Sequence, residues 1–582
     1  MSTNMVHLTI NDLPIEVPAG TSILNAARTV GINIPTLCHY DAGEYSYMNN
    51  VASCRVCMVE ITGRRNLAPA CSTQVGNDMV IRTDSPRAIR ARRTMVELLL
   101  SNHPSDCLVC DRNGNCMLQK IAGDLGIRGV KFQGATTHYE KDESSYSLVR
   151  NPDKCILCRR CETVCSKVQG LGVYSATGRG FGTTIGTAFD LPMIDTACTF
   201  CGQCVSVCPT GALTEVDNSE EVWNLIAQEG KVIIAQTAPA IRVALGEEFG
   251  MEPGTAVTGK MVSALRRLGF DKVMDTNFAA DITILEEASE FLHRLQHGGT
   301  LPMITSCCPA WVKFIEHQFP DMLDLPSTCK SPHEMFGALA KTFYADKLGV
   351  KPEDIVVVSI MPCLAKKFEA ERPELNHQGN SDVDIVLSTR ELARMIREAG
   401  IDFANLSDDE FDAPMGVSSG AADIFGSTGG VMEAALRTAY EWVTETKLEN
   451  VNFEQVRGLA GVRDAEIAIG DVTIKIAIAH GLANVRTLLE RIKSGEADYH
   501  MIEVMACPGG CISGGGQPYT MGDMEILRKR AAGLYSIDTS KTMRRSHENP
   551  DVLHLYEEFI GEVYGAKAHE LLHTSYSPRR RV

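Results

Sequence analysis

The strongest constraint on this chain is the cysteine pattern C-x2-C-x2-C-x3-C, which occurs twice within residues 155–208. The second copy is followed by Pro209. In proteins with two 4Fe–4S clusters, the fourth cysteine of each run ligates the other cluster. Two zinc sites are the alternative, since four thiolates also suit zinc, but the repeated spacing and the proline favour iron–sulfur. The two predicted ligand sets are Cys155, Cys158, Cys161 and Cys208, and Cys198, Cys201, Cys204 and Cys165.

The bulk composition is compatible with a metal-rich intracellular protein. The 582 residues include 21 cysteines, an odd number that cannot pair fully within the chain. We find no signal peptide and no apolar run of about 18 residues, so we expect a cytoplasmic protein without a membrane span. A net charge of −17 argues against nucleic-acid binding, which requires a basic face. In a reducing compartment, this much cysteine indicates metal rather than disulfides.

The N-terminal segment, residues 1–82, has the pattern of a 2Fe–2S ferredoxin-like domain of the β-grasp type. Residues 6–17 alternate apolar and polar side chains, which predicts a hairpin, and a helix should begin near Ser22. A zinc ribbon is the alternative. The predicted ligands of the 2Fe–2S cluster are Cys38, Cys54, Cys57 and Cys71.

Residues 83–140 carry a histidine four positions before a C-x2-C pair. A zinc finger would rarely place the histidine first, so we favour a 4Fe–4S cluster with one imidazole and three thiolate ligands. Imidazole removes negative charge and should raise the reduction potential, as it does in Rieske centres. The predicted ligands are His103, Cys107, Cys110 and Cys116. Residues 141–217 then form the domain with the two repeated runs.

Residues 218–582 change to longer strand-like and helix-like segments, typical of an α/β domain with parallel sheets. Apolar runs at 231–235 and 355–358 predict strands, and 281–297 and 388–399 predict helices. Loops rich in cysteine and glycine follow the strand-like runs, which is where open α/β sheets place their sites. The fold class is therefore multidomain, α+β at the N-terminus and α/β at the C-terminus.

Three cysteine segments in this last part carry the decisive motifs. They read TSCCPAW from 305, MPCLAKKFE from 361 and MACPGGCISGGGQP from 505. They resemble the three signature motifs of the diiron (FeFe) hydrogenases, and the accessory pattern resembles the long form of that family. The likeness covers nearly the whole chain. It implies the reversible reaction 2H⁺ + 2e⁻ ⇌ H₂.

The resemblance implies a composite active-site cluster, the H-cluster. A 4Fe–4S cube would be bridged by Cys511 to a diiron subcluster that bears CO, cyanide and an azadithiolate. The glycines around Cys511 would let the backbone pass this group without a side chain in the way. The implied cube ligands are Cys308, Cys363, Cys507 and Cys511.

The resemblance also assigns residues around the diiron group. Lys366 would be the buried cation that donates to a cyanide, whereas the next lysine, Lys367, fits an exposed position. The further predicted contacts are Ala238, Pro239, His333, Met361 and Met505. The methionines are nearly as well explained by core packing. Relatives often have a hydroxyl where this chain has Ala240, and an amide at the position of His333.

The implied proton route begins at Cys307, the residue before a cube ligand. Chain direction should turn its thiol away from the cube. Glu287, Glu290 and Arg294 share one helix face, and without the resemblance the last two would be an ordinary surface ion pair. Cys329 has no derived role and is best explained as a small buried apolar residue. The implied order is Cys307, Glu287, Ser327, Glu290 and Arg294.

Three other functions compete with the enzyme. A pure electron-transfer subunit would lack the motifs after residue 300, and an iron–sulfur scaffold would not need Cys307, Glu287 and Lys366 together. A hydrogen sensor would usually lack Cys307. The expected electron partners are ferredoxin or flavin- and NAD(P)-binding subunits of a hydrogenase complex, because no such domain is on the chain. Dedicated maturation proteins would supply the CO and cyanide.

Overall fold

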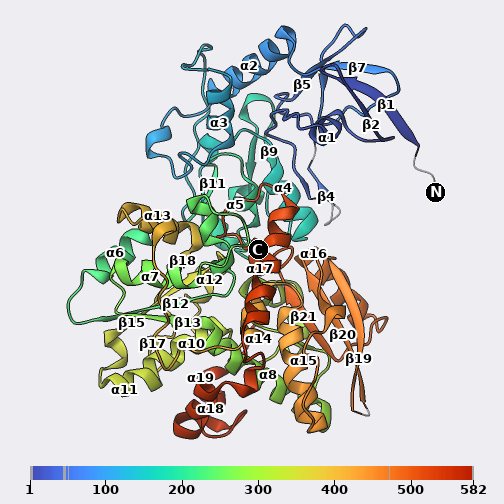
Figure 1. The fold of residues 1–582 in the computed structure, drawn as a ribbon. Coiled ribbons are helices and arrows are strands. Elements are labelled where there is room, and N and C mark those ends of the chain that lie inside the picture. The colour runs from blue at the N-terminus through green and yellow to red at the C-terminus, as the bar shows by residue number, and fades with distance from the viewer. Residues whose placement is uncertain (1–3, 43–46, 50, 471, 580–582) are drawn as a thin grey trace.

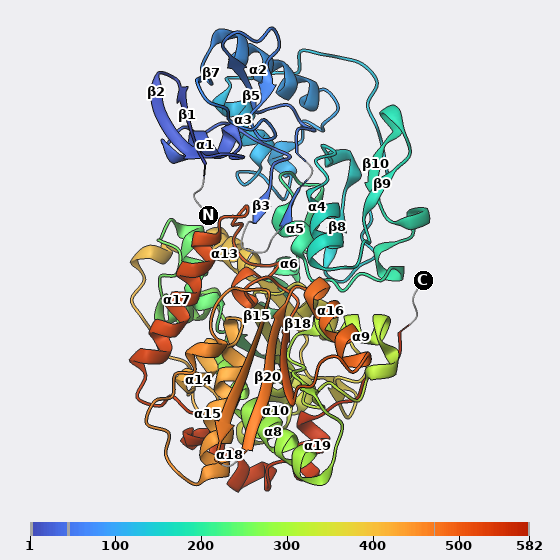
Figure 2. The same ribbon diagram turned by 90° about the vertical axis from the view of Figure 1, so that its right-hand side faces the viewer.

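The computed structural model of the protein describes residues 4–42, 47–49, 51–470 and 472–579. Figure 1 shows the N-terminal elements at one end of an elongated molecule and the elements after α6 at the other. The view in Figure 2 shows the same two levels, with the segment that contains β8–β10 between them. Among the described residues, no helix combines the length and the apolar character needed to cross a membrane.

The first domain is a five-stranded sheet with α1 packed on it. The predicted hairpin and helix are confirmed: β1 pairs with β2, and the Ser22 side chain accepts a hydrogen bond from the N–H of Asn25 at the start of α1. The sheet order is β2-β1-β7-β5-β6. A two-stranded ribbon of β3 and β4 lies in the loop after α1. The elements are β1 (Met5–Ile10), β2 (Leu13–Pro18), α1 (Ile23–Thr29), β3 (Asp41–Ala42), β4 (Tyr47–Met48), β5 (Met58–Ile61), β6 (Ala68–Pro69) and β7 (Met79–Arg82).

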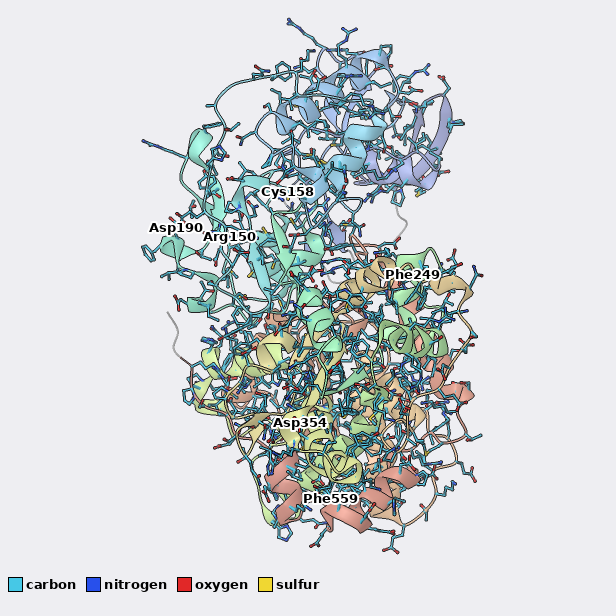
Figure 3. The ribbon with its side chains drawn as sticks, turned by 90° about the vertical axis from the view of Figure 1, so that its left-hand side faces the viewer. Arg150, Cys158, Asp190, Phe249, Asp354 and Phe559 are labelled. Carbon is cyan, nitrogen blue, oxygen red and sulfur yellow. The ribbon has the colours of Figure 1, made fainter. Side chains whose placement is uncertain are left out.

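Short elements separate the cysteines of residues 86–215. Pro86 begins α2 with Ser85 as its cap, and two small antiparallel pairs follow, β9 with β10 and the more distant β8 with β11. Figure 3 places Cys158, Arg150 and Asp190 in this intermediate region, well away from Asp354 and Phe559 at the far end. The elements are α2 (Pro86–Leu100), α3 (Met117–Asp124), β8 (Leu148–Arg150), α4 (Arg160–Thr163), β9 (Ser175–Thr177), β10 (Thr184–Gly186), α5 (Gln203–Val207) and β11 (Leu213–Glu215).

Two four-stranded sheets organise the remaining residues, as the sequence predicted. The first, in the order β13-β12-β15-β18, is entirely parallel. The second, β14-β21-β20-β19, is parallel except for the hairpin β19–β20. The strands are β12 (Val232–Thr237), β13 (Lys272–Asp275), β14 (Met303–Ile304), β15 (Ile355–Met361), β18 (Ile385–Ser388), β19 (Val462–Ile469), β20 (Val472–His480) and β21 (Met501–Met505).

Helices cover both sheets and bury their apolar faces. The predicted helices at 281–297 and 388–399 are confirmed as α8 and α13. The helices are α6 (Ser219–Ile226), α7 (Thr258–Leu268), α8 (Thr276–His297), α9 (Pro309–Gln318), α10 (Pro332–Leu339), α11 (Ala345–Leu348), α12 (Ala365–Glu369), α13 (Thr389–Glu398), α14 (Gly420–Asp423), α15 (Gly430–Thr444), α16 (Leu482–Lys493), α17 (Met524–Ser540), α18 (Pro550–Leu555) and α19 (Ala566–Leu572). A small ribbon, β16 (Asn376–His377) with β17 (Asn380–Ser381), completes the set.

The sheet topology brings the three cysteine motifs and the loop at Ala238 to one place. Four parallel strands, β12, β14, β15 and β21, are each followed within a few residues by a motif loop. Because the carboxyl ends of parallel strands lie at one edge, loops far apart in the sequence converge there. These loops begin at Ala238, Cys307, Cys363 and Cys507.

Candidate active site

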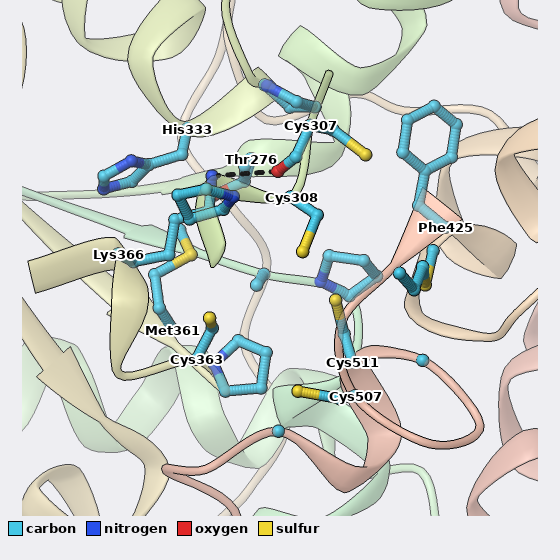
Figure 4. Close-up of a pocket in the computed structure, with 18 of the residues that line it drawn as sticks. Thr276, Cys307, Cys308, His333, Met361, Cys363, Lys366, Phe425, Cys507 and Cys511 are labelled. Carbon is cyan, nitrogen blue, oxygen red and sulfur yellow. Dashed lines mark hydrogen bonds between the residues drawn. The ribbon is translucent and has the colours of Figure 1, made fainter. Parts of the chain in front are cut away.

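The motif loops enclose one cavity at the strand ends. Figure 4 shows the sulfur atoms of Cys308, Cys363, Cys507 and Cys511 pointing toward one another across it. Burial, followed by the neighbouring thiols of Cys363 and Cys201, raises the pKa of Cys507 well above its ordinary value. Burial disfavours the charged thiolate form unless a cation neutralises it. Four converging thiols in such a place are a donor set that suits an iron–sulfur cube.

Apolar groups form most of the remaining wall. All five predicted contact residues line the cavity, and so does Phe425, which no sequence motif indicated. Ala240 is buried just outside, where its carbonyl oxygen accepts a hydrogen bond from Gln517 Nε2 at 3.1 Å. The predicted contact residues are Ala238, Pro239, His333, Met361 and Met505.

Glycine is required at two positions beside Cys511. Gly510 has φ +97°, and a Cβ atom there would lie 2.7 Å from the backbone nitrogen of Thr428. At Gly514, a Cβ atom would lie 2.2 Å from the Pro362 carbonyl oxygen. Both contacts are shorter than atoms allow, so these glycines let the loop close around the cavity.

Lys366 lies at the cavity wall, as predicted, but it is already paired. Its Nζ donates to Glu369 Oε2 at 2.5 Å and to Ser331 Oγ at 2.7 Å, and the Cys307 carbonyl oxygen lies at 3.3 Å. Burial opposes its charge, yet the Glu369 carboxylate keeps the pKa of Lys366 above its ordinary value. The partner Glu369 was missed, although its position three residues on in the same short helix, α12, was a usable signal.

The two ring nitrogens of His333 differ: Nδ1 contacts carboxylates, whereas Nε2 has no partner among the described residues. Its Nδ1 lies 3.1 Å from Glu369 Oε2 and 2.9 Å from Glu334 Oε1. Its Nε2 is buried, with no hydrogen-bond partner among the described residues. A buried unpaired polar atom in a cavity wall fits a group that a ligand will contact.

One expectation from the sequence was wrong. Lys367 is buried, not exposed: its Nζ donates to Glu391 Oε1 at 2.9 Å and to the Val386 carbonyl at 2.7 Å. Glu391 also closes the capping box of α13 with Ser388, so this lysine joins α12 to α13. The alternative interpretation of Glu290 and Arg294 as an ordinary surface pair does not fit the structure, because only 1% and 12% of their side chains are exposed. The α8 face that carries them is covered by the loop before α10.

The predicted proton-route residues lie next to one another on one side of the cavity. Figure 4 shows the Cys307 thiol turned away from the other four, as expected from chain direction. Burial, and then the Glu290 carboxylate, raise the pKa of Glu287 to about 8, while the Ser306 N–H and the Ser327 hydroxyl oppose the shift. Ser327 Oγ donates to Glu290 Oε2 at 3.0 Å.

The accessory cysteines group as the sequence spacing predicted. Burial is the main cause that raises the pKa of Cys155 and of Cys158, and the nearby Cys208 raises both further. The fourth cysteine of the second run therefore lies with the first run. Likewise, burial and then the nearby Cys198 raise the pKa of Cys165, so Cys165 lies with the second run. Cys155, Cys158, Cys161 and Cys208 line one cavity.

The remaining two sets differ in how completely they are assembled. The Cys38 thiol is within hydrogen-bonding contact of Cys54 and Cys71, and Cys57 of Cys71. In the other set, Cys110 lies near Cys116, and Nδ1 of His103 is buried without a partner among the described residues. Cys107 is exposed on a short turn.

Backbone contact joins the accessory region to the cavity. A Cβ atom at Gly515 would lie 2.6 Å from the Cα of Gly202, which follows Cys201. Gln203 Nε2 donates to the Ser513 carbonyl oxygen at 2.9 Å across the same seam. Cys201 therefore lies near Cys507 across this seam.

The comparisons with known proteins agree with this geometry along the chain. Residues 231–515 match the family described as the C-terminal domain of the iron-only hydrogenase large subunit, and residues 524–579 match the iron hydrogenase small subunit. Before them, 3–86 match a 2Fe–2S cluster binding domain, 92–131 the iron–sulfur binding region of NADH-ubiquinone oxidoreductase G, and 154–212 a 4Fe–4S dicluster domain.

The NADP-reducing hydrogenase subunit HndD of Solidesulfovibrio fructosivorans is 57% identical over 100% of both chains. The chain belongs to the iron-only (FeFe) hydrogenase family. Iron hydrogenase 1 of Clostridium pasteurianum is 39% identical over 98% of this chain and 100% of its own. A solved structure of HydA1 from Chlamydomonas reinhardtii is 42% identical, with a TM-score of 0.57, over 62% of this chain and 99% of that chain. The protein is thus an iron–sulfur oxidoreductase that interconverts protons and H₂, as the motifs predicted.

Proposed function

We propose that the four cavity thiols hold a 4Fe–4S cube and that Cys511 also bridges to a diiron subcluster with CO, cyanide and azadithiolate ligands. The observation that carries this proposal is the convergence of Cys308, Cys363, Cys507 and Cys511 in one cavity of mostly apolar lining. Glycines where a Cβ atom would collide with backbone support it, because a closely fitted group needs the same space on its other side.

The bound group would supply the iron at which hydrogen is formed or split. The chain would hold and move the protons. Cys307 Sγ faces away from the four ligand thiols, so it can exchange a proton with a group in the cavity on one side and with Glu287 on the other. Ser327 and Glu290 continue the route through their hydrogen bond of 3.0 Å. Lys366 and His333 Nε2 would face the anionic cyanide ligands as donors.

Electrons would pass along one 2Fe–2S and three accessory 4Fe–4S clusters. The domain division at 1–82, 83–140, 141–217 and 218–582 follows from the ligand sets, and the close seam at Gly202 and Gly515 supports the last transfer. The name of the HndD relative supports an NAD(P)-linked complex in which other subunits bind flavin and nicotinamide. Ferredoxin is the second candidate donor, and maturation proteins would deliver the diiron group. We assign the protein to the cytoplasm.

Infrared spectroscopy of the anaerobic protein, coexpressed with maturation proteins, tests the active-site assignment. Bands of metal-bound CO and cyanide are expected, with about twenty iron atoms per chain from the two-iron cluster, the three four-iron clusters and the six-iron active site. Absence of these bands, even after a synthetic diiron complex is supplied, would favour a scaffold or electron-transfer role. Fewer iron atoms with the bands present would contradict only the accessory count.

A further inference from the structure

Glu290 lies at the centre of a buried hydrogen-bond network that continues past the predicted route. Its Oε2 accepts from Ser327 Oγ and from Thr328 Oγ1, each at 3.0 Å. Its Oε1 accepts from Arg294 Nη2 at 2.5 Å and from Nε at 3.0 Å. The carboxylate therefore has two possible continuations toward the surface, one through Arg294 and one through Thr328.

Arg294 is poorly suited to pass a proton on. A guanidinium stays protonated throughout the pH range in which proteins are folded. It can therefore orient a carboxylate, but it cannot be deprotonated and reprotonated during turnover. Its remaining N–H groups are also engaged, since Nη1 lies 3.0 Å from the Asp324 carbonyl oxygen and Nη2 lies 2.9 Å from that of Pro326. The structure thus gives Arg294 the geometry of a clamp on Glu290.

Thr328 leads to the imidazole of His573. Its Oγ1 lies 2.8 Å from Nδ1 of His573, and Nε2 of the same ring lies 3.1 Å from Glu286 Oε2. The Thr328 hydroxyl has one proton, which it donates to Glu290. Its oxygen must therefore accept a hydrogen bond from His573, so Nδ1 carries a proton and donates it. The backbone fixes this alignment: Thr574 N–H donates to the Thr328 carbonyl oxygen at 2.7 Å, and Cys329 and His573 form a β-bridge.

Other ionisable groups surround His573 and extend to the exposed His569. Glu286 from α8 is fully buried and also accepts from the Tyr556 hydroxyl and the Tyr564 N–H. The exposed His569 lies with its ring centroid 4.3 Å from that of His573. The remaining groups that face this cluster are the Tyr564 ring, the buried Cys329 thiol, Glu290 and, on the exposed side of α8, His293.

We propose that His573, acting through the Thr328 hydroxyl, is the proton-exchange group between Glu290 and the solvent, and that Arg294 only positions Glu290. This inference rests on the proposed function of the route from Cys307 to Glu290. It also gives a role to residues 524–579, the segment that matches the small subunit, since that segment supplies the imidazole. Imidazole is the side chain that ordinarily changes charge near neutral pH.

The transfer conserves every proton. His573 Nδ1–H donates its proton to Thr328 Oγ1 as that hydroxyl releases its own proton to Glu290 Oε2. The imidazolium becomes neutral, and its Nε2–H remains bonded to Glu286. The ring, whose side chain is 4% exposed, regains a proton from the solvent beside His569. Hydrogen oxidation runs the same steps in reverse.

The test uses the matured holoenzyme with Thr328→Val and His573→Gln, singly and together. Each change should lower hydrogen turnover about tenfold, a modest share of a general acid–base effect, and the double variant should be no slower than either single one. Thr574→Val is the matched control, because its hydroxyl is buried without a partner among the described residues. The CO and cyanide bands should be unchanged in all variants.

A second readout does not depend on turnover. Infrared difference spectra between acidic and alkaline pH, recorded on protein without the diiron group, should lose an imidazole signal in His573→Gln. The carboxylate band assigned with Glu290→Gln should shift in the same variant, because the two groups share the Thr328 hydroxyl. Free imidazole should restore part of the turnover of His573→Ala.

The outcomes separate this inference from the proposed route. Full activity of Thr328→Val and His573→Gln, with an inactive Glu290→Gln, would overturn the role of His573 and leave the route to Glu290 intact. Full activity of Glu290→Gln would overturn the proposed route itself. If His573→Gln failed to fold, Thr328→Val would decide alone, since valine has the shape of threonine and lacks only the hydroxyl.

Discussion

Replacing Glu287 with glutamine tests the electrostatic basis of the proton route. Glu287 is fully buried, and neither of its carboxylate oxygens has a hydrogen-bond partner of normal geometry among the described residues. Burial, with the Glu290 carboxylate second, raises its pKa to about 8, so it is mostly a neutral acid at pH 7. Glutamine has the same shape and remains neutral, but it has no acidic proton to pass on. The variant should fold well and fail in catalysis.

The magnitude follows from the shift in pKa. A change from 4.5 to about 8 corresponds to about 5 kcal/mol for ionising Glu287 inside the fold. Since the folded pKa is the higher one, the folded state holds the proton longer than the unfolded state. The wild-type protein therefore loses stability as the pH rises from about 4.5 to about 8, by up to that amount. Glutamine loses none, so the stability of the variant relative to the wild type should rise from about pH 4.5 upward and reach its full difference above about pH 8.

Thermal unfolding at pH 6 and pH 9, at one scan rate, measures this difference, and hydrogen turnover measures the catalytic loss. We expect a higher midpoint for Glu287→Gln at pH 9 and a turnover reduced at least about 100-fold. Glu316→Gln is a control whose gap to the wild type should be the same at pH 6 and pH 9: although burial opposes it, Arg372 holds the pKa of Glu316 below its ordinary value, so its contribution changes only in more acidic solution. A pH-independent gap between wild type and Glu287→Gln, or retained turnover, would refute the reasoning.

Three further changes test other parts of the site. Cys307→Ala should abolish turnover while the CO and cyanide bands remain, which infrared spectra and a hydrogen assay check together. Cys511→Ser should prevent stable insertion of the diiron group, so those bands should be missing while accessory iron remains. Gly515→Ala should slow reduction of the active site by the accessory clusters in rapid-mixing experiments, because the added Cβ forces the loop away from Gly202. Normal kinetics in this last variant would show that the seam is not the electron path.

The sequence predicted those parts of the site that depend on the spacing of cysteines and on the order of strands and loops along the chain. The repeated cysteine runs fixed the exchange of Cys165 and Cys208 between sets, because a cluster constrains its ligands tightly. The strand-then-loop pattern predicted where the motifs would meet, because parallel strands end at one edge. These inferences need only residue type and order along the chain.

Other features depend on packing between distant segments and carry no local signal. Lys367 reads as a surface lysine, yet the approach of α13 buries it against Glu391. His573 follows a short helix of ordinary composition, and only the pairing of 572–574 with 328–330 brings its ring to Thr328. A single sequence gives the probability that a lysine or histidine is exposed, but the fold decides which partner it meets.

The proposed paths of electrons and protons leave the cavity on different sides. Cys507 lies near Cys201 on the side of the accessory region, where the backbone of Gly515 approaches that of Gly202. Cys307 and Glu287 lie on the other side, and α8 carries the route toward α19 at the end of the molecule away from the N-terminal domains (Figure 2). Electron transfer needs short distances between clusters, whereas proton transfer needs groups that change charge near neutral pH. A defect at Gly515 should therefore leave the pH dependence of turnover unchanged, and a defect at His573 should leave the rate of cluster reduction unchanged.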